Sequence, residues 1–379
     1  MEDNLYQALT RLRHELHQYP EVSGNEHHTA KRILEALKSH TPDEVIHLGG
    51  TGLAAVYNGQ QPGPTTLLRA ELDALPITEK NNIEHISTQQ GISHVCGHDG
   101  HMVSLIGVAA HLATNKPQKG RVVLLFQPAE EDGRGAIAVY KDAGFKAIKP
   151  DYVFAYHNIP GAQLGHVLLK EGVFTAAAKS IIITLTGKTS HAAEPENGHN
   201  PALAMAQITQ EVLQLQNPKI SAPDFALITP VYSRLGSKAY GVSAGDGELH
   251  FTLRTFSNKV MKDLDEAILR TSRSIAAAHY LEVSFSYTEE FEANENGHES
   301  IELLRTAVEN GGHMATEKSE PFKWGEDFGV FTSRFKGAMF GIGSGINCPA
   351  LHNPDYDFPD AILPTAVSMY IGLINQLNN

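Results

Sequence analysis

The sequence predicts an α/β protein, in which a mostly parallel sheet forms the main domain and a smaller ferredoxin-like domain is inserted into it. Three observations predict this. The chain has 379 residues, whereas an ordinary domain has about 150, so two domains are expected. Strands alternate with helices in the first and last parts of the chain, which is typical of a parallel sheet. Between these parts, residues 178–289 follow the order β-α-β-β-α-β.

The first part of the chain begins with helices. Helical spacing of apolar residues predicts helices over 4–18 and 25–38. A longer apolar helix is expected at "HMVSLIGVAAHLAT" and a further helix at "AIAVYKDAGF". Continuous apolar runs mark buried strands, and the strands expected here are "GLAAVYNG", "TTLLRAELDALP", "GRVVLLFQPAEE" and "PDYVFAYHNIPG".

The inserted part contains four expected strands and two helices. The strands are "KSIIITLTGK", "FALITPVYSRLG", "GELHFTLRTF" and "YLEVSFSYTEE", and the helices are "NPALAMAQITQEVLQLQ" and 258–279. Afterwards "SIELLRTAVENGG", "GAMFGIGSG" and a helix over 361–377 return to the first style. We therefore assign 1–177 and 290–379 to one domain and 178–289 to a separate domain inserted into it.

Composition excludes several classes of protein. The net charge of −13 argues against nucleic acid or an anionic membrane surface as the main partner, because both require fields of Lys and Arg. No basic segment precedes an apolar one at the start, so no signal peptide is expected, and no run of 18 apolar residues indicates a membrane span. With only Cys96 and Cys348, a disulfide framework is not expected. A cytoplasmic location is the default expectation.

Residues suited to metal binding collect where ligand sites form in open α/β sheets, at strand ends and the loops beyond them. "AELDALP" ends one expected strand and "CGHDGH" opens a helix. "QPAEEDG" and "FAYHNIP" end two further strands, and "ALHNPDYDFPD" follows a Gly-rich strand. The side chains that these motifs supply are Glu71, Asp73, Cys96, His98, Asp99, Glu130, Glu131, His157 and His352.

Thiolate, imidazole and carboxylate groups are the ligands of Zn²⁺ and similar divalent ions. Cys96 and His98 are separated by one Gly, so a loop can direct both at one ion. Asp73 or Asp99 could accept a hydrogen bond that orients a ligand His. Side chains alternate along a strand, so Glu130 and Glu131 are expected to face different ways: one as a ligand, the other as a general base over the bound water.

Each motif also has an ordinary structural interpretation. Asp99 could cap a helix, Cys96 could be a small buried hydrophobe, and His157 could be a core His with satisfied hydrogen bonds. The acidic pair and the His352 loop could simply be solvated. Their joint placement along one predicted sheet favours a catalytic metal site over these separate explanations.

The motifs resemble those of the metal-dependent amidohydrolases that include hippurate hydrolases, N-acyl-amino-acid deacylases and auxin-conjugate hydrolases. The matching pieces occur in the family's order over nearly the whole chain: "RAELDALPI", "HVCGHDGHM", "FQPAEEDGRGA", "YHNIPG", "TSHAAEPENGHNP", "LRTF", "GEDFGVF" and "LHNPDYDFPD". The resemblance implies a zinc-peptidase-like catalytic domain with two divalent ions, Mn²⁺ or Zn²⁺, and an inserted lid that dimerises.

The resemblance also implies roles for individual residues. It makes Glu130 the general base, and it implies the metal ligands Cys96, His98, Glu131, His157 and His352. His191 would reach an active site across the dimer and stabilise the oxyanion or the substrate carboxylate. Arg254, Asn200 and Gly343 would contact the substrate.

Three departures from the family pattern blur the substrate but leave the expected metal ligands in place. Glu71 stands where many relatives have Asp, and Gly241 in "AYGVSAG" replaces a polar lid residue. "HNIPGAQLG" lacks a second Pro. The hypothesis is an amidohydrolase for N-acyl amino acids or similar small amides, working as a homodimer. The alternatives are a dipeptidase or carboxypeptidase-type enzyme and a non-catalytic metal-binding dimer.

Overall fold

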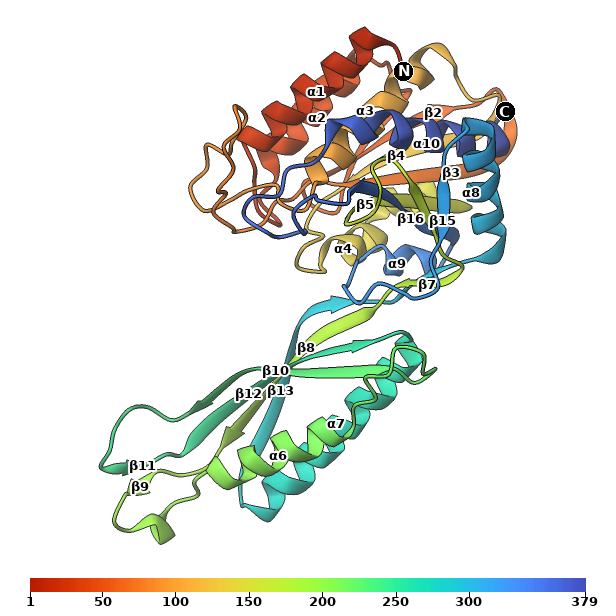
Figure 1. Ribbon diagram of the computed structural model, residues 1–379. Helices are drawn as coiled ribbons and strands as arrows, with labels where there is room; N and C mark the ends of the chain where they lie inside the picture. The colour runs from red at the N-terminus through yellow and green to blue at the C-terminus, as the bar shows by residue number, and fades with distance from the viewer. The chain divides into compact units, whose positions relative to one another are not determined.

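The computed structural model describes residues 1–379 and contains two compact units (Figure 1). The first unit comprises residues 1–174, 294–319 and 326–379. The second comprises 175–293 and 320–325, so it contains the expected insertion, a few residues at each end of it and a short later segment. No helix combines the length and the apolarity that crossing a membrane requires.

The first unit is built on an eight-stranded sheet with the order β1-β2-β4-β3-β5-β16-β6-β15. Its strands are β1 (Glu44–Leu48), β2 (Gly52–Asn58), β3 (Gln61–Glu71), β4 (Lys119–Gln127), β5 (Tyr152–Pro160), β6 (Val167–Leu169), β15 (Ala315–Glu317) and β16 (Lys336–Gly345). The central neighbours β4, β3, β5 and β16 are all parallel, so their carboxyl ends meet at one edge. The predicted mostly parallel α/β fold is confirmed. A separate ribbon pairs β7 (Gly172–Thr175) with β14 (Asn294–Asn296).

Helices cover both faces of this sheet (Figure 1). One layer holds α1 (Asp3–Gln18), α2 (His27–Lys38), α3 (His98–Thr114), α8 (His298–Gly311) and α10 (Leu363–Leu377). The other holds α4 (Gly135–Lys141), α5 (Ala143–Ile148) and α9 (Gly329–Thr332). The single helix expected over "AIAVYKDAGF" was wrong. Asp142 has extended backbone and accepts a hydrogen bond from Gly144 N, so one helix ends there and another begins.

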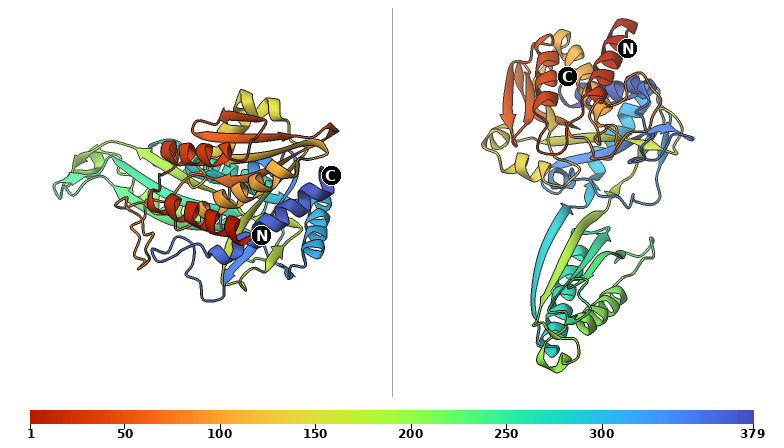
Figure 2. Two further views of the ribbon diagram at one scale, coloured as in Figure 1. Left: turned by 90° about the horizontal axis from the view of Figure 1, so that it is seen from above. Right: turned by 90° about the vertical axis from the view of Figure 1, so that its left-hand side faces the viewer.

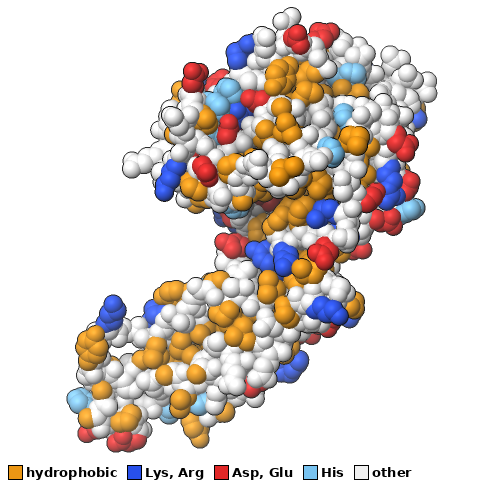
Figure 3. Space-filling view, viewed as in Figure 1, with side chains coloured by type: hydrophobic (Ala, Val, Ile, Leu, Met, Phe, Trp, Pro, Cys, Tyr) orange, Lys and Arg blue, Asp and Glu red, His pale blue; other side chains and the backbone are white.

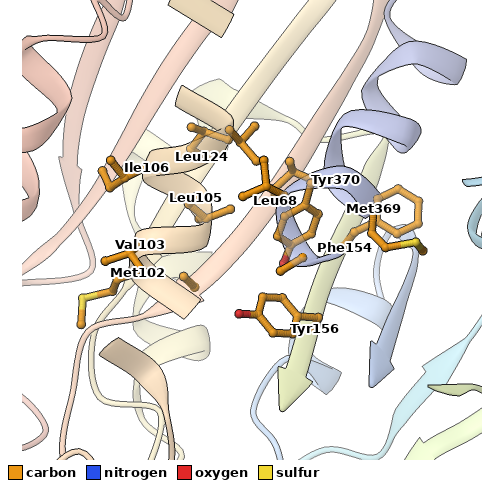
Figure 4. Packing of buried hydrophobic residues seen from close by; sticks show 14 of the residues in the cluster. Leu68, Met102, Val103, Leu105, Ile106, Leu124, Phe154, Tyr156, Met369 and Tyr370 are labelled. Carbon is orange, nitrogen blue, oxygen red and sulfur yellow. The ribbon is translucent and has the colours of Figure 1, made fainter. Parts of the chain in front are cut away.

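Helix α3 fixes the position of the first unit's site. Its side chains are apolar on nearly every face because it lies between the sheet and the helices α1, α2 and α10. Figure 4 shows α3 residues among side chains of β3, β4, β5 and α10: Leu68, Met102, Val103, Leu105, Ile106, Leu124, Phe154, Tyr156, Met369 and Tyr370. Each fully buried large apolar side chain contributes about 1.5–3 kcal/mol. The start of α3, at His98, is therefore held firmly against the sheet.

The second unit is a four-stranded antiparallel sheet with the order β10-β12-β8-β13. Its main elements are β8 (Ala177–Thr186), α6 (Ala202–Gln214), β10 (Ala226–Leu235), β12 (Asp246–Thr255), α7 (Asn258–Ala278) and β13 (Glu282–Phe291). Both helices cover one face of the sheet (Figure 2). This element order and strand order are those of a ferredoxin-like fold, as predicted. Between these elements lie the short strands β9 (Ser190–His191) and β11 (Val242–Ser243) and the turn Pro195–Asn197. In the first unit, the turn Asp360–Ile362 directly precedes α10.

Candidate metal centre

The predicted ligands of the first unit meet at the carboxyl edge of its sheet. Cys96 and His98 lie at the start of α3, and Gly97 between them has φ +96°. A side chain at position 97 would place Cβ 2.7 Å from the Asn158 Oδ1 atom. Only glycine combines this backbone conformation with this close approach. The turn thus brings Cys96 and His98 toward His157, which lies near the end of β5.

Two overlapping groups of ligand atoms result. Cys96, His98 and His157 form one group, and Cys96, Glu131 and His352 form the other, each with ligand atoms within 4.8 Å of one another. Cys96 Sγ lies 3.5 Å from His157 Nε2, and Glu131 Oε2 lies 3.6 Å from His352 Nε2. All five predicted ligands are therefore assembled, and the shared thiol suits a pair of neighbouring ions.

Unpaired buried atoms point into this cluster. His98 Nε2 and Glu131 Oε1 are buried without a hydrogen-bond partner and lie 3.8 Å apart. The other ring nitrogen, His98 Nδ1, donates to the Asp73 carbonyl oxygen at 2.8 Å, which leaves the Nε2 lone pair directed at the cluster. Leaving a buried polar atom unpaired costs about 1–3 kcal/mol. A divalent cation would satisfy both atoms, so the residues fit the metal that their chemistry implies.

His352 is the ligand with the most unusual backbone. Its φ is +65°, a conformation that residues with a Cβ atom rarely adopt, and its backbone N donates to Val95 O at 2.9 Å. The side chain is 50% exposed, unlike the other ligands. Strained conformations of this kind are concentrated at functional sites. His352 thus forms the solvent-facing side of the cluster.

The expectation that Glu130 and Glu131 face opposite ways was wrong. Strand β4 ends at Gln127, so both residues belong to a turn in which strand alternation no longer applies. The carboxylate of each lies 3.8 Å from the same His98 Nε2 atom. Their surroundings differ, because Glu130 Oε1 accepts a weak hydrogen bond from Asp327 N at 3.4 Å, whereas Glu131 also lies beside His352.

A buried charge cluster lies behind Glu130. The fully buried Arg69 guanidinium contacts the carboxylates of Glu71, Glu326 and Asp327. Burial raises the pKa of Glu130 well above its usual value, and Glu326 and Glu131 raise it further. Burial likewise raises the pKa of Asp327 to about 8 against the opposing effect of Arg69. One arginine faces several buried carboxylates, so the cluster has an excess of acidic groups that bound cations would offset.

The ligands themselves respond to this acidic environment. Burial and the carboxylates of Glu131 and Glu130 raise the pKa of the Cys96 thiol well above its usual value. Burial alone would lower the pKa of His98, but the carboxylates of Glu71, Asp73 and Glu131 outweigh it and raise that pKa to about 10. A divalent ion favours thiolate and neutral imidazole, so metal binding would release protons here.

The two aspartates suggested as orienting residues have different roles. Asp73 contacts His98 through its carbonyl oxygen, and its Oδ2 atom accepts from Glu131 N at 2.9 Å. Asp99 contacts Arg13 and His17 at 3.1 and 2.9 Å, away from the ligand atoms. Asp73 is therefore the residue whose contacts match the expected orienting role.

The remaining predicted site residues lie elsewhere. Gly343 is in β16, where a Cβ atom would lie 1.9 Å from Gln163 O. His191, Asn200 and Arg254 belong to the second unit. His191 is exposed on β9, Asn200 bonds to Ser243 Oγ at 2.9 Å, and Arg254 donates to Lys323 O at 2.9 Å. Their use in catalysis stays a prediction.

Several residues of the site had no predicted role. These are Arg69, His101, Glu326 and Asp327, all buried; Glu71, which a motif had offered as a candidate, contacts Arg69 and His101. His101 Nδ1 lies 2.7 Å from Glu71 Oε2. His101 follows His98 by three positions on one helix, so helical spacing could have indicated it. Arg69 and Glu326 are 257 positions apart, and only the acidic pair in "GEDFGVF" gave a signal for their contact.

Comparison with known proteins supports the same assignment. The sequence profile of peptidase family M20/M25/M40 matches residues 67–376. Hippurate hydrolase of Campylobacter jejuni is 29% identical over 98% of this chain and 96% of its own length. N-acetyl-L-cysteine deacetylase of Bacillus subtilis is 32% identical over 89% of this chain and 81% of its own.

A solved structure agrees with both sequence matches. It is a Bacillus subtilis protein described as a dinuclear metal-binding peptidase of family M20, with a TM-score of 0.84 and 25% identity, and the likeness covers 99% of each chain. The resemblance to metal-dependent amidohydrolases that the motifs indicated is confirmed, and this chain belongs to peptidase family M20/M25/M40.

Proposed function

We propose that this amidohydrolase removes the acyl group from N-acyl amino acids, with Glu130 as the general base. The observation that carries the proposal is the placement of two acidic side chains around one unpaired ligand atom. Glu130 and Glu131 both lie 3.8 Å from His98 Nε2, but only Glu131 also lies beside His352. These distances support Glu131 as the metal ligand and Glu130 as the residue that transfers the proton.

The substrate class rests on the relatives. Proteins that match nearly the whole chain are named for hippurate, N-acetyldiaminopimelate and N-acetylcysteine. These molecules differ in the acyl group and in the amino acid, but all are N-acyl amino acids. Family membership therefore supports cleavage of the amide bond more strongly than it supports any particular acyl group or amino acid.

Each part of the first-unit site has a task in this hydrolysis. Two divalent ions would be held by Cys96, His98, Glu131, His157 and His352. When bound, they would polarise the substrate carbonyl and lower the pKa of water. Glu130 takes a proton from the attacking water and delivers it to the leaving amine.

Residues of the second unit complete the proposal. His191 Nδ1 accepts a hydrogen bond from Ala193 N at 3.1 Å, so the proton is on Nε2, which is free to donate to an oxyanion. Arg254, Asn200 and, from the first unit, Gly343 are proposed to contact the substrate. We also propose that His191 acts across a homodimer formed by the second units.

The exposed edge of the second unit supports a dimer. β10 is an edge strand, and its Val231, Tyr232 and Leu235 side chains are 55%, 49% and 43% exposed. Hydrophobic side chains gather on the visible face of this unit (Figure 3). Exposed apolar edge strands are prone to pair with another chain.

The cytoplasmic location and the choice between Mn²⁺ and Zn²⁺ stay predictions.

A hydrolysis screen tests the proposed function. N-acetyl amino acids, N-benzoyl amino acids and dipeptides are each incubated with metal-free protein to which Mn²⁺ or Zn²⁺ is added. We expect release of free amino acid from at least one N-acyl series. Preferential cleavage of dipeptides would favour the dipeptidase alternative. Metal binding with no hydrolysis of any substrate would favour the non-catalytic alternative.

A further inference from the structure

We propose that Glu26 is a positioning residue for catalysis, because it holds the turn from which the base Glu130 projects. The inference rests on the proposed role of Glu130. Glu26 lies in the loop "PEVSGNE", residues 20–26, which precedes α2 and to which the sequence assigned no function. Glu26 is fully buried. It contacts a turn that lies 103 positions further along the chain.

The contact is a single well-formed hydrogen bond to the turn. Glu26 Oε1 accepts from Ala129 N at 2.9 Å, directly before Glu130. Ala129 has φ +50°, an unfavourable conformation for a residue with a Cβ atom. Such a backbone persists only where surrounding groups enforce it. The buried carboxylate of Glu26 supplies that enforcement at the residue next to the base.

A second carboxylate holds the other side of the same residue. Asp73 Oδ2 accepts from Glu131 N at 2.9 Å, so acceptors fix the amides on both sides of Glu130. Ser23 Oγ donates to the same Asp73 oxygen at 2.7 Å. Ser23 and Glu26 come from the same loop, so one short segment supports both anchors of the turn.

The loop is itself anchored to the sheet. Ala74 N donates to Glu21 O at 2.8 Å, and Val22 forms a parallel bridge with Ala74. Glu26 also accepts from Gly24 N of the same loop at 2.7 Å and from Thr51 Oγ1, directly before β2, at 2.6 Å. These bonds fix the rotamer of Glu26. The carboxylate is thus held rigidly, and none of these contacts joins it to a proposed metal ligand side chain.

The central experiment compares Glu26→Ala with a matched control, Glu21→Ala. Glu21 lies in the same loop, but its carboxylate bonds only to Thr29, at 2.7 Å from N and 3.0 Å from Oγ1. Three quantities are measured: kcat and KM with an N-acyl substrate that the screen has identified, metal content, and hydrogen exchange of the 127–135 segment. Hydrogen exchange reports the turn without requiring any catalytic activity.

We expect Glu26→Ala to lower kcat by about 10²-fold, because a displacement of about 1 Å of a catalytic group has an effect of that size. KM and metal content should stay near their wild-type values, and exchange of the Ala129 amide should become faster. Glu26→Gln retains an acceptor oxygen and should restore most of the activity and the protection. Glu21→Ala should change neither kcat nor exchange in this segment.

Several results would overturn the proposal. One is a Glu26→Ala protein with the kcat of the Glu21→Ala control; another is a joint loss of kcat and metal. If Glu26→Ala does not fold, Glu26→Asp is compared with Glu26→Gln. The shorter Asp side chain moves the acceptor oxygen away from Ala129 N, whereas Gln keeps it in place. Equal kcat and exchange in those two would reject the role. If the wild type hydrolyses nothing, the proposed function fails, while the exchange data still decide whether Glu26 holds the turn.

Discussion

Glu130 and Glu131 are adjacent residues of one type, and only their surroundings give them different chemistry. Glu131 lies within 3.8 Å of ring nitrogens of both His98 and His352, as a metal ligand requires. Glu130 approaches His98 alone and otherwise faces the acidic cluster around Arg69, where burial and Glu326 raise its pKa. The proposed division of roles between the two residues therefore rests on their different environments.

This difference predicts opposite effects of two conservative changes. Glu130→Gln should lower kcat by at least about 10²-fold, because the amide cannot take a proton, while metal content stays unchanged. Glu131→Gln should lower metal content, because an anionic ligand is lost. Metal analysis alongside steady-state kinetics measures both. Loss of metal from Glu130→Gln with retention in Glu131→Gln would show that the roles are reversed.

At the residue scale, the sequence predicted candidate ligands that the structure brings together, but not the groups that pack behind them. Cys96, His98 and Glu131 stand in short motifs whose spacing carries the chemistry, so they could be found without a structure. Arg69 and Glu26 could not, because each acts through a contact with residues more than a hundred positions away. Such contacts depend on which strands become neighbours, which local pattern does not encode.

At the element scale, α1 is joined to the start of α3 by buried polar contacts. His17 Nδ1 lies 2.9 Å from Asp99 Oδ2, and His17 Nε2 lies 3.1 Å from Glu79 Oε1. Arg13 contacts Asp99 at 3.1 Å and Asp357 at 2.7 Å. These bonds tie α1 to the turn that carries His98, to the loop of Glu79 and to the segment that follows His352. α1 thus supports the metal centre although it supplies no ligand.

The His17 contacts predict a pH-dependent contribution to stability. Burial lowers the pKa of His17, but Asp99 and Glu79 outweigh this and raise it from 6.5 to about 9. Protonated His17 therefore stabilises the folded state. This contribution is fully present below about pH 6.5 and disappears as the pH rises through about 9. The shift from 6.5 to about 9 corresponds to at most about 3–4 kcal/mol.

Thermal unfolding of metal-free wild type and His17→Gln tests this at several pH values. The difference in Tm between the two proteins should be largest near pH 6 and should shrink toward pH 9.5. His40→Gln is the control, because burial lowers the pKa of His40 and its contribution should not fall over this range. A difference for His17→Gln that stays constant or grows with pH would contradict the assignment.

Elements with strong apolar patterns were predicted well, and elements defined by capping or pairing were not. α3 and β5 are buried along their length, so their apolar runs marked them. The break between α4 and α5 depends on the Asp142 side chain, which the apolar pattern does not register. β6 and β15 have three residues each and are defined by pairing, β15 with β6 and β6 also with β16. Short strands of this kind have too few residues to show a period.

At the scale of the whole molecule, metal binding and folding of the first unit should be linked. Ligands come from the start of α3, the turn after β4, the end of β5 and the His352 loop, so an ion would join segments far apart in the chain. A ligand that binds only the folded state stabilises it by about 2.7 kcal/mol at a hundredfold excess over Kd. We therefore expect chelation to lower the Tm of the first unit.

Calorimetry with Mn²⁺ or Zn²⁺ added back to chelated protein measures this effect. The Tm should recover, with about two ions bound per chain, the count expected for a dinuclear centre. The Cys96→Ala, His98→Ala double variant should show neither recovery nor full metal content. Unchanged metal content in that variant would place the ions somewhere other than at the predicted ligands.

The last prediction concerns the molecule as a dimer. His191 belongs to the second unit and the metal ligands to the first. If His191 serves the partner's site, each active site needs two chains. Removing an oxyanion donor typically costs about 10²–10³ in kcat, so His191→Ala should be impaired to that degree with its metal content unchanged. The exposed edge of β10 predicts that the wild type is a dimer by light scattering.

Mixing two inactive variants distinguishes the arrangements. In a dimer of one His191→Ala chain and one Glu130→Gln chain, a shared arrangement gives one site with both residues intact and one with neither. Half of the wild-type activity per mixed dimer is then expected, because one of the two sites works. If His191 serves its own chain, both sites of the mixed dimer lack one residue and no activity returns. Differently tagged chains show that subunits have exchanged, so an inactive mixture of exchanged dimers would reject the crossing of His191 between chains.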